Sequence, residues 1–295
     1  MVNRLLPYTN HFLKLKNGIR YHYLDEGEGA PVVMLHGNPS WCYYYRNLVE
    51  RLRGSHRVIV PDHIGCGLSD KPGDDSYDYT LSSRVADLEQ LLEHLDIDRD
   101  ITLVVHDWGG MIGMAYATRY PQRIAKLVVL NTSAFHLPAS KPLPLPLKIC
   151  RDSAVGSFLV RALNAFAVAA AFVGCKRHPM PRALRCAYTA PYNNWKNRIA
   201  TLRFVQDIPL APGDKAWDEV TRVEDNLHQL RHKPLLICWG ERDFVFDHHF
   251  LALWQSQFPS AQIHRCADAG HYVLEDAASE IIPRICAFIT ADTTV

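Results

Sequence analysis

The segment 101–120 constrains the fold more than any other part of the chain. Residues 101–105 form an apolar run, residues 106–110 read HDWGG, and a helical pattern continues to residue 120. A side chain on such a strand–turn–helix junction projects from the end of a sheet, and the glycines let the helix pack closely on the strand. The turn therefore predicts that Asp107 is a nucleophile, since a carboxylate needs no base for its own activation. The alternative is an aspartate that only caps the helix.

Short apolar runs alternate with helical patterns along the rest of the chain. The alternation is typical of a parallel sheet with crossover helices. We expect an α/β-hydrolase fold, with a mostly parallel sheet, flanking helices and an opening hairpin whose edge strand covers residues 19–24. The spacing of Val85, Leu88, Leu92 and Leu95 predicts one of the helices. The expected buried strands cover residues 31–35, 58–61, 101–105, 127–130 and 235–239, and residues 261–266 are expected to form the last strand.

The strand pattern stops after Asn131, and residues 133–214 read as helical. We expect an inserted helical cap over 133–214, with a core built from residues 1–132 and 215–295. Residues 154–174 are the most apolar stretch of the cap and predict a buried or cavity-lining helix pair, suited to a hydrophobic small-molecule substrate. The unbroken apolar part of this stretch is too short to span a bilayer. A peripheral membrane contact remains open.

A second motif follows the predicted strand 31–35. Residues 36–41 read HGNPSW, and in this fold the loop after that strand faces the nucleophile. Asn38 offers an amide N–H, and Trp108, directly after the nucleophile, offers an indole N–H. Two neutral donors can hold a leaving anion. For each residue alone there is another explanation: turn chemistry before proline for Asn38, and core packing for Trp108.

The base and the orienting acid are expected after the last two strands. His271 is preceded by Gly270 and lies between the last strand and the final helix. It would activate the water that cleaves an ester intermediate. Residues 240–243 read GERD, and Asp243 is the favoured acid, with Glu241 and Asp247 as fallback acids. The order nucleophile, acid, histidine is that of this fold.

Composition excludes several classes of function. The net charge is +1, from 32 basic and 31 acidic residues, which gives no footprint for nucleic acid. Eight cysteines are scattered without a CxxC pair, so we expect reduced thiols, no metal site and a cytoplasmic location. The N-terminus has no signal-peptide core. No cofactor is expected.

These motifs resemble the haloalkane dehalogenase branch of the α/β hydrolases. The likeness rests on HGNPSW at 36–41, PDHIGCGLSD at 61–70, VHDWGG at 105–110 and the Gly-His pair at 270–271. It implies that Asn38 and Trp108 hold a leaving anion. Epoxide hydrolases share the turn at Asp107 but usually carry an aromatic residue where Asn38 stands. They also need acidic donors from the cap, for which Tyr188 and Tyr192 are candidates.

The cap carries a closer likeness. FLVRALNAF at 158–166, APYNNWKNRI at 190–199 and FVQDIPL at 204–210 resemble the β-lactone decarboxylases of bacterial long-chain olefin biosynthesis. The resemblance implies a cis-3,4-dialkyl β-lactone as substrate, an alkene and carbon dioxide as products, and assembly with other enzymes of the pathway. Haloalkane dehalogenation is the alternative, and epoxide hydrolysis ranks below it. A binding protein without activity ranks last, because nucleophile, donors, acid and histidine are all present.

Overall fold

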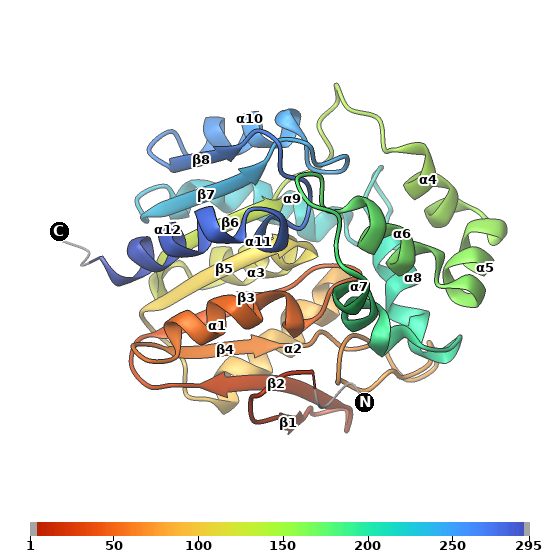
Figure 1. Ribbon diagram of the computed structural model, residues 1–295, viewed down its shortest axis with the longest axis horizontal. Coiled ribbons are helices and arrows are strands. Elements are labelled where there is room, and N and C mark those ends of the chain that lie inside the picture. The colour runs from red at the N-terminus through yellow and green to blue at the C-terminus, as the bar shows by residue number, and fades with distance from the viewer. Residues whose placement is uncertain (1–4, 292–295) are drawn as a thin grey trace.

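A twisted sheet runs through the centre of the molecule in the computed structural model, which describes residues 5–291 (Figure 1). Within those residues eight strands follow the order β1-β2-β4-β3-β5-β6-β7-β8. The strands from β3 onward run parallel, and β2 pairs antiparallel with both β1 and β4. Their bounds are β1 His11–Lys14, β2 Arg20–Glu26, β3 Pro31–Leu35, β4 Arg57–Pro61, β5 Ile101–Asp107, β6 Ile124–Thr132, β7 Leu235–Gly240 and β8 Gln262–Cys266.

The five predicted buried strands are confirmed as β3 to β7, and the predicted last strand is β8, which is only partly buried. One prediction about the hairpin is wrong. Residues 19–24 were expected to form an edge strand, but β2 lies between β1 and β4. The edge strand is β1, a run of only four residues that alternates between exposed and half-buried positions. So short an alternation is a weak signal in a sequence.

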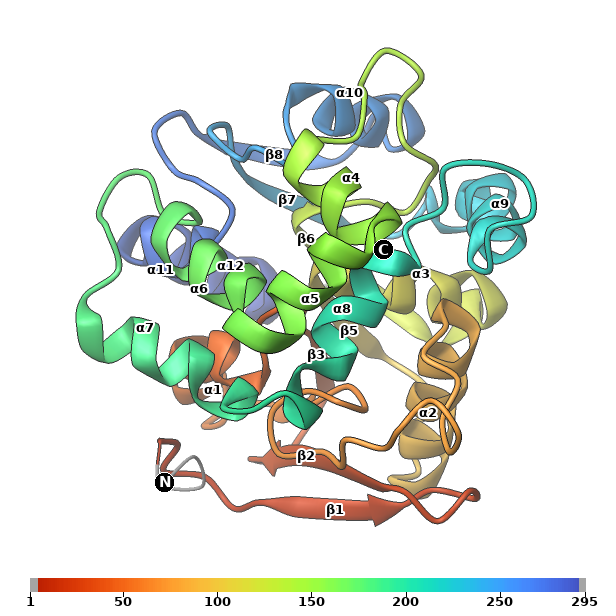
Figure 2. The ribbon, with the colours of Figure 1, turned by 90° about the vertical axis from the view of Figure 1, so that its right-hand side faces the viewer.

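Helices cover both faces of the sheet and create two separate cores (Figures 1 and 2). One core packs under α2, α3, α9 and α10, and the other under α1, α11 and α12. Alternate residues of β3 point into opposite cores, as the pleat of a strand requires. The bounds are α1 Arg46–Leu52, α2 Leu81–His94, α3 Trp108–Arg119, α9 Trp217–Asn226, α10 His248–Gln257, α11 Val273–Asp276 and α12 Ala278–Thr290.

The chain leaves the sheet after β6 and forms a group of helices beside the carboxyl ends of the parallel strands, on the right of Figure 1. These helices are α4 Leu145–Asp152, α5 Ala154–Leu163, α6 Ala165–Val173, α7 Arg182–Thr189 and α8 Ile199–Gln206. Short 3-10 turns join several elements: η2 Cys42–Tyr45, η3 Pro121–Arg123, η4 Ala190–Tyr192, η5 Lys196–Arg198 and η6 Leu227–Leu230. We propose that residues 133–214 act as the cap, and that 1–132 and 215–295 form the core.

The apolar stretch 154–174 is a helix pair, as predicted, but it is only partly buried. Asn164 separates α5 from α6 in a left-handed conformation, with φ of 54°, and the two helices are bent by 77°. The Val155 and Leu163 side chains are 66% and 63% exposed. Among the described residues no single helix is long and apolar enough to cross a membrane. This bent pair meets the requirement only when both helices are counted together, and by length and composition alone.

Candidate active site

Asp107 ends β5 in a strained turn. Its φ and ψ are 50° and −127°, a conformation that L-residues rarely adopt. Two glycines make the turn fit, because a Cβ on Gly109 would collide with the backbone of Leu35 and a Cβ on Gly37 with the Asp107 side chain. The Asp107 side chain makes no hydrogen bond that caps α3. Its Oδ1 instead accepts the backbone N–H of Asn38 at 2.6 Å, so the capping alternative is not what the structure shows.

His271 lies between two carboxylates at the carboxyl edge of the sheet. Its Nδ1 is 2.8 Å from Oδ2 of Asp243, and its Nε2 is 3.8 Å from Oδ2 of Asp107. His106 holds the backbone of His271 in place, because its Nε2 donates a hydrogen bond to the His271 carbonyl at 2.9 Å. The structure thus brings together the three residues predicted as nucleophile, acid and histidine, in the geometry of a catalytic triad.

The environment shifts the pKa of both central groups. Burial raises the pKa of Asp107, although the nearby His271 and the backbone N–H groups of Asn38 and Trp108 act against the rise. Burial lowers the pKa of His271, but the carboxylates of Asp243 and Asp107 outweigh it, and the pKa is raised. The two carboxylates thus favour the protonated form of the imidazole, and the imidazole favours the ionised form of Asp107 against the effect of burial.

Asn131 is a positioning residue that the sequence analysis missed. It lies near the end of β6, and its amide donates to Oδ2 of Asp243 at 3.1 Å and to the Gly240 carbonyl at 3.0 Å. Its Oδ1 accepts the Gly240 N–H at 2.8 Å. Only its place at the end of a buried strand marks it in the sequence. These bonds fix the loop that carries Asp243.

The two fallback acids lie elsewhere in the structure. Asp247 pairs with Lys141 at 2.5 Å and caps α10 through the His249 N–H. Glu241 is exposed and pairs with Arg265 at 3.2 Å. Asp243 is therefore the acid that reaches His271.

The two predicted anion donors both lie close to the Asp107 carboxylate. They differ in whether the side chain already donates a hydrogen bond within the protein. Asn38 Nδ2 donates to the Thr201 carbonyl in α8 at 3.1 Å, which leaves its second amide hydrogen. The Trp108 indole N–H has no hydrogen-bond partner among residues 5–291, and both side chains line a cavity. The Trp108 ring packs against Phe204 of α8, with centroids 5.4 Å apart. The cap thus helps to orient both donors.

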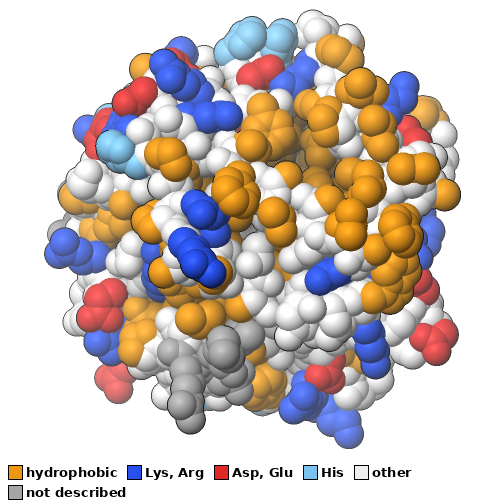
Figure 3. All heavy atoms as spheres, turned by 45° about the vertical axis from the view of Figure 1, so that its right-hand side comes forward, with side chains coloured by type: hydrophobic (Ala, Val, Ile, Leu, Met, Phe, Trp, Pro, Cys, Tyr) orange, Lys and Arg blue, Asp and Glu red, His pale blue; other side chains and the backbone are white. Residues whose placement is uncertain are grey.

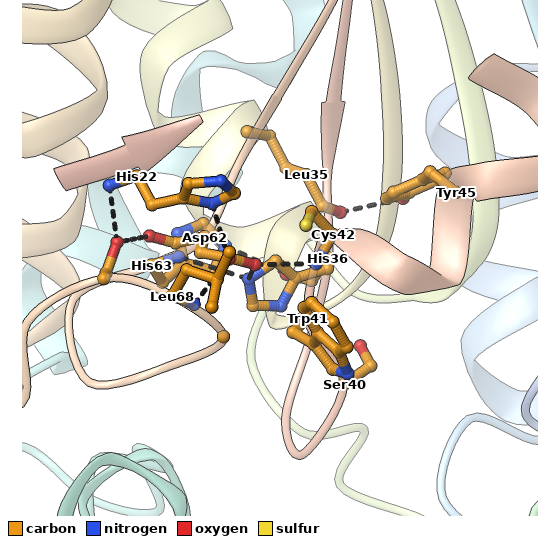
Figure 4. Close-up of polar contacts among 12 residues, drawn as sticks. His22, Leu35, His36, Ser40, Trp41, Cys42, Tyr45, Asp62, His63 and Leu68 are labelled. Carbon is orange, nitrogen blue, oxygen red and sulfur yellow. Dashed lines mark hydrogen bonds and ion pairs between the residues drawn. The ribbon is translucent and has the colours of Figure 1, made fainter. Parts of the chain in front are cut away.

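A buried network holds the loop that carries Asn38 (Figure 4). Asp62 sits at its centre and accepts the N–H groups of Cys42 at 2.7 Å and Leu68 at 2.8 Å, while His22 Nδ1 lies 2.7 Å from its Oδ2. Burial raises the pKa of Asp62, but the contacts with His22 and His36 outweigh it and hold that pKa well below its usual range. A charged, fully bonded carboxylate of this kind fixes the loop 36–41 next to Asp107.

A cavity with an empty volume of about 950 Å³, part of it open to solvent, lies between the core and the cap. Asp107 and His271 stand at its polar end, and most of the remaining lining is apolar. Cap residues that line it include Leu143, Leu147, Phe166, Ala170 and Ile208. An elongated apolar substrate would gain affinity by burying its chains here.

Tyr188 and Tyr192, the candidate acidic donors for epoxide opening, are directed away from this cavity. The Tyr188 hydroxyl donates to Glu275 at 2.6 Å, and the Tyr192 hydroxyl donates to the Ser40 carbonyl at 2.9 Å. Neither residue is part of the cavity lining. Their role here is structural.

Comparison with known proteins shows which family this chain resembles. The family model for the alpha/beta hydrolase fold matches residues 30–278. A cis-3-alkyl-4-alkyloxetan-2-one decarboxylase of Shewanella oneidensis is 58% identical, over 100% of this chain and 92% of its own. One of the same name from Xanthomonas campestris is 50% identical, over 96% of each chain.

Among solved structures, the haloalkane dehalogenase DatA of Agrobacterium tumefaciens has a TM-score of 0.84 at 25% identity, covering 96% of each chain. The match to the family model covers most of the chain, and the mostly parallel sheet with flanking helices is consistent with an alpha/beta hydrolase fold. The chain belongs to the alpha/beta hydrolase fold family.

Proposed function

We propose that this chain is a lyase that converts cis-3-alkyl-4-alkyloxetan-2-ones, the cis-dialkyl β-lactones, into cis-alkenes and carbon dioxide. The observation that carries the proposal is the Asp107 carboxylate, which lines a largely apolar cavity, in a chain 58% identical to a protein named for this reaction. The lactone ring would lie at Asp107, and the two alkyl chains would occupy the apolar part of the cavity.

In the first step Asp107 attacks the ring carbon that bears the ring oxygen. A bond forms from the Asp107 carboxylate to this carbon, the ring carbon–oxygen bond breaks, and a substrate carboxylate is released. The indole N–H of Trp108 and the free amide hydrogen of Asn38 are the donors for this developing anion. No proton needs to move in this step.

In the second step the substrate carboxylate leaves as carbon dioxide. The electrons of the broken carbon–carbon bond form the double bond, and the bond to Asp107 breaks and regenerates its carboxylate. Inversion in the first step followed by anti elimination preserves the cis geometry. The protonated His271, 3.8 Å from Asp107, would stabilise the departing carboxylate. In a second route Asp107 attacks the lactone carbonyl and forms an acyl-enzyme first.

A product assay tests the proposal. Purified protein is given a cis-dialkyl β-lactone and, separately, a 1-bromoalkane of matched chain length, and alkene and bromide are measured. The proposal predicts a cis-alkene from the lactone at a rate well above that of bromide release. Bromide release with no alkene would contradict it.

Haloalkane dehalogenation is the second candidate, favoured by the fold of DatA and by the position of His271 beside Asp107. In that reaction His271 takes a proton from water, which attacks the Asp107 ester. Turnover in ¹⁸O-water separates the two, because attack of water on the ester carbonyl places ¹⁸O in the Asp107 carboxylate. Decarboxylation by the first route leaves Asp107 unlabelled. The peptide that contains Asp107 is weighed by mass spectrometry.

The place of the reaction in the cell is part of the same proposal. We propose a cytoplasmic enzyme of olefin biosynthesis that assembles with neighbouring enzymes of the pathway. The support for the location is that all eight cysteines are free thiols, which suits a reducing compartment. The support for the pathway is the likeness of the cap to the β-lactone decarboxylases.

A further inference from the structure

The outer face of the cap is unusually apolar. Eleven large hydrophobic side chains are exposed among the described residues, and nine of them lie between residues 145 and 195. The most exposed are Leu145, Val155 and Leu163, each at more than 60%, followed by Phe158 and Phe172 at 57% and 58%. All five belong to the consecutive helices α4, α5 and α6, so the exposed apolar side chains are concentrated on one part of the surface. A gathered apolar surface of this kind marks an interaction site.

The excess of positive charge is also concentrated on the cap. Residues 133–214 contain eleven Lys and Arg but only three Asp and Glu, a net charge of +8, whereas the rest of the chain contains 21 basic and 28 acidic residues. Lys148 of α4 and Lys196 of η5 are exposed and have no ion-pair partner in the part of the chain that the structure describes. Lys148 lies next in sequence to the exposed Ile149, and Lys196 next to the exposed Trp195.

Arginine side chains lie over two of the exposed aromatic rings. The Arg161 guanidinium is 4.7 Å from the centre of the Trp195 ring, and that of Arg185 is 4.3 Å from the centre of the Phe172 ring. Aromatic rings beside cations are suited to the boundary between lipid headgroups and acyl chains. Figure 3 shows hydrophobic side chains gathered around a hollow on this face, with Lys and Arg side chains beside them.

The same helices connect this face to the cavity. On α4, Leu147 lines the cavity while Leu145 is exposed; on α6, Phe166 lines the cavity while Phe172 is exposed. The cavity wall and the apolar outer face are therefore two sides of the same helices.

We propose that the outer face of α4, α5 and α6 docks on a bilayer that contains anionic lipid. The apolar side chains enter the headgroup boundary, and the unpaired cations meet lipid phosphates. Because α5 and α6 are bent by 77°, they suit an orientation in the plane of the surface and not a span. A second copy of this chain is the weaker candidate, since it would bring together two segments 133–214 that each carry an excess of basic residues. The inference holds whichever reaction the cavity catalyses.

Vesicle sedimentation of the purified full chain tests this inference. The vesicles are phosphatidylcholine alone, or phosphatidylcholine with about a third phosphatidylglycerol. We expect binding to the anionic vesicles, at least several-fold weaker binding to the neutral ones, and release as salt rises. No binding to either kind, or equal binding to both, would contradict the proposal.

Two pairs of variants locate the surface. Phe158→Ser with Leu163→Ser should reduce the bound fraction at least fivefold, while Phe12→Ser, an exposed aromatic on β1 outside the cap, should leave it unchanged. Lys148→Glu with Lys196→Glu should lower the partition coefficient roughly tenfold or more. Lys14→Glu with Lys16→Glu makes the same change in net charge at the sheet edge and should have a clearly smaller effect.

Thermal unfolding checks that each variant is folded, and sedimentation velocity without lipid reports self-association. A dimer that dissociates in the Phe158→Ser, Leu163→Ser variant, without vesicle binding by the wild type, would assign the face to a protein interface. That result would overturn the proposal. Turnover of a water-soluble short-chain substrate should be unchanged in all four variants, which separates docking from chemistry.

Discussion

The single residue on which the account depends is Asp107, whose carboxylate is buried and meets His271 on one side and two backbone N–H groups on the other. Burial raises its pKa, and those contacts act against the rise because they favour the ionised form. A carboxylate in this setting is less solvated than one in water and attacks carbon more readily.

The rate of alkene formation should depend on pH through both charged groups. It falls as pH drops through the raised pKa of Asp107, because the protonated acid is no nucleophile. It also falls as pH rises through the raised pKa of His271, because the imidazolium that stabilises the departing carboxylate is lost. Initial rates from pH 4 to 10 check this. A rate that keeps rising on the alkaline side would point to a neutral His271 acting as a base.

Asn131→Ala should lower kcat for alkene formation by roughly tenfold and leave KM nearly unchanged. The change removes the bonds that orient Asp243, and through it His271, but touches nothing in the cavity lining. The buried Gly240 N–H also loses its partner, so stability should fall by about 1–3 kcal/mol. Steady-state kinetics and urea unfolding measure the two effects. A rise in KM with unchanged kcat would show that Asn131 acts on substrate binding instead.

At the scale of elements, the helices of the cap contact the predicted anion donors and supply part of the cavity lining. α8 supplies the carbonyl that holds Asn38 and the ring that packs on Trp108, while α4 and α6 supply apolar lining. We therefore expect the core loops to determine the chemistry and the cap to determine the choice of substrate.

Ala170→Phe should select against long substrates. Ala170 of α6 lines the cavity, and a phenyl ring there would occupy space that an alkyl chain needs. We expect kcat/KM for long-chain lactones to fall at least tenfold, with a smaller effect on short ones, since each buried methylene contributes about 0.8 kcal/mol. Ala169→Phe, which adds the same ring on the exposed side of α6, is the control. Equal losses for short and long chains would contradict this.

The motifs predicted more of the site than of the cap. Asp107 ends a strand of the sheet, the other four residues follow strands, and the carboxyl ends of parallel strands meet at one edge. The other four are Asn38, Trp108, Asp243 and His271. Their closeness therefore follows from the fold class once the strands are recognised.

Contacts that depend on tertiary packing were not predictable in this way. Nothing in the sequence places the Thr201 carbonyl on the Asn38 amide, or Asn131 on Asp243. The exposed side of α5 and α6 was also missed, because an apolar composition does not say which partner covers it. The four residues of β1 were too short to recognise as the edge strand.

At the scale of the whole molecule, stability should depend on buried carboxyls far from the chemistry. Burial raises the pKa of Asp87 to about 6, although the Tyr77 hydroxyl and Arg84 act against it. Burial likewise raises the pKa of Asp207, the neighbour of Arg84 in the cap, to about 6. Both groups bind protons more tightly in the folded chain than in the unfolded one, so the free energy of unfolding falls as pH rises from about 4 to about 6.

Asp87→Asn should remove part of this fall in the free energy of unfolding. The amide oxygen still accepts the Tyr77 hydroxyl, and no charge needs to be buried. We expect the variant to be more stable than the wild type at pH 8 by roughly 1–3 kcal/mol, with the difference vanishing near pH 4. Urea unfolding at both pH values measures it. A variant that is less stable at pH 8 would show that the charged form of Asp87 stabilises the fold through its interaction with Arg84.

The most direct measurement compares alkene formation from a cis-dialkyl β-lactone by the wild type and by Asp107→Asn, a substitution of nearly equal size and shape. We expect cis-alkene from the wild type. In the variant the rate of alkene formation should fall on the order of 10³-fold or more, because an amide does not supply the attacking oxygen. Both proteins should unfold at similar temperatures. Undiminished alkene formation by a folded Asp107→Asn would contradict the assignment of Asp107 as the nucleophile.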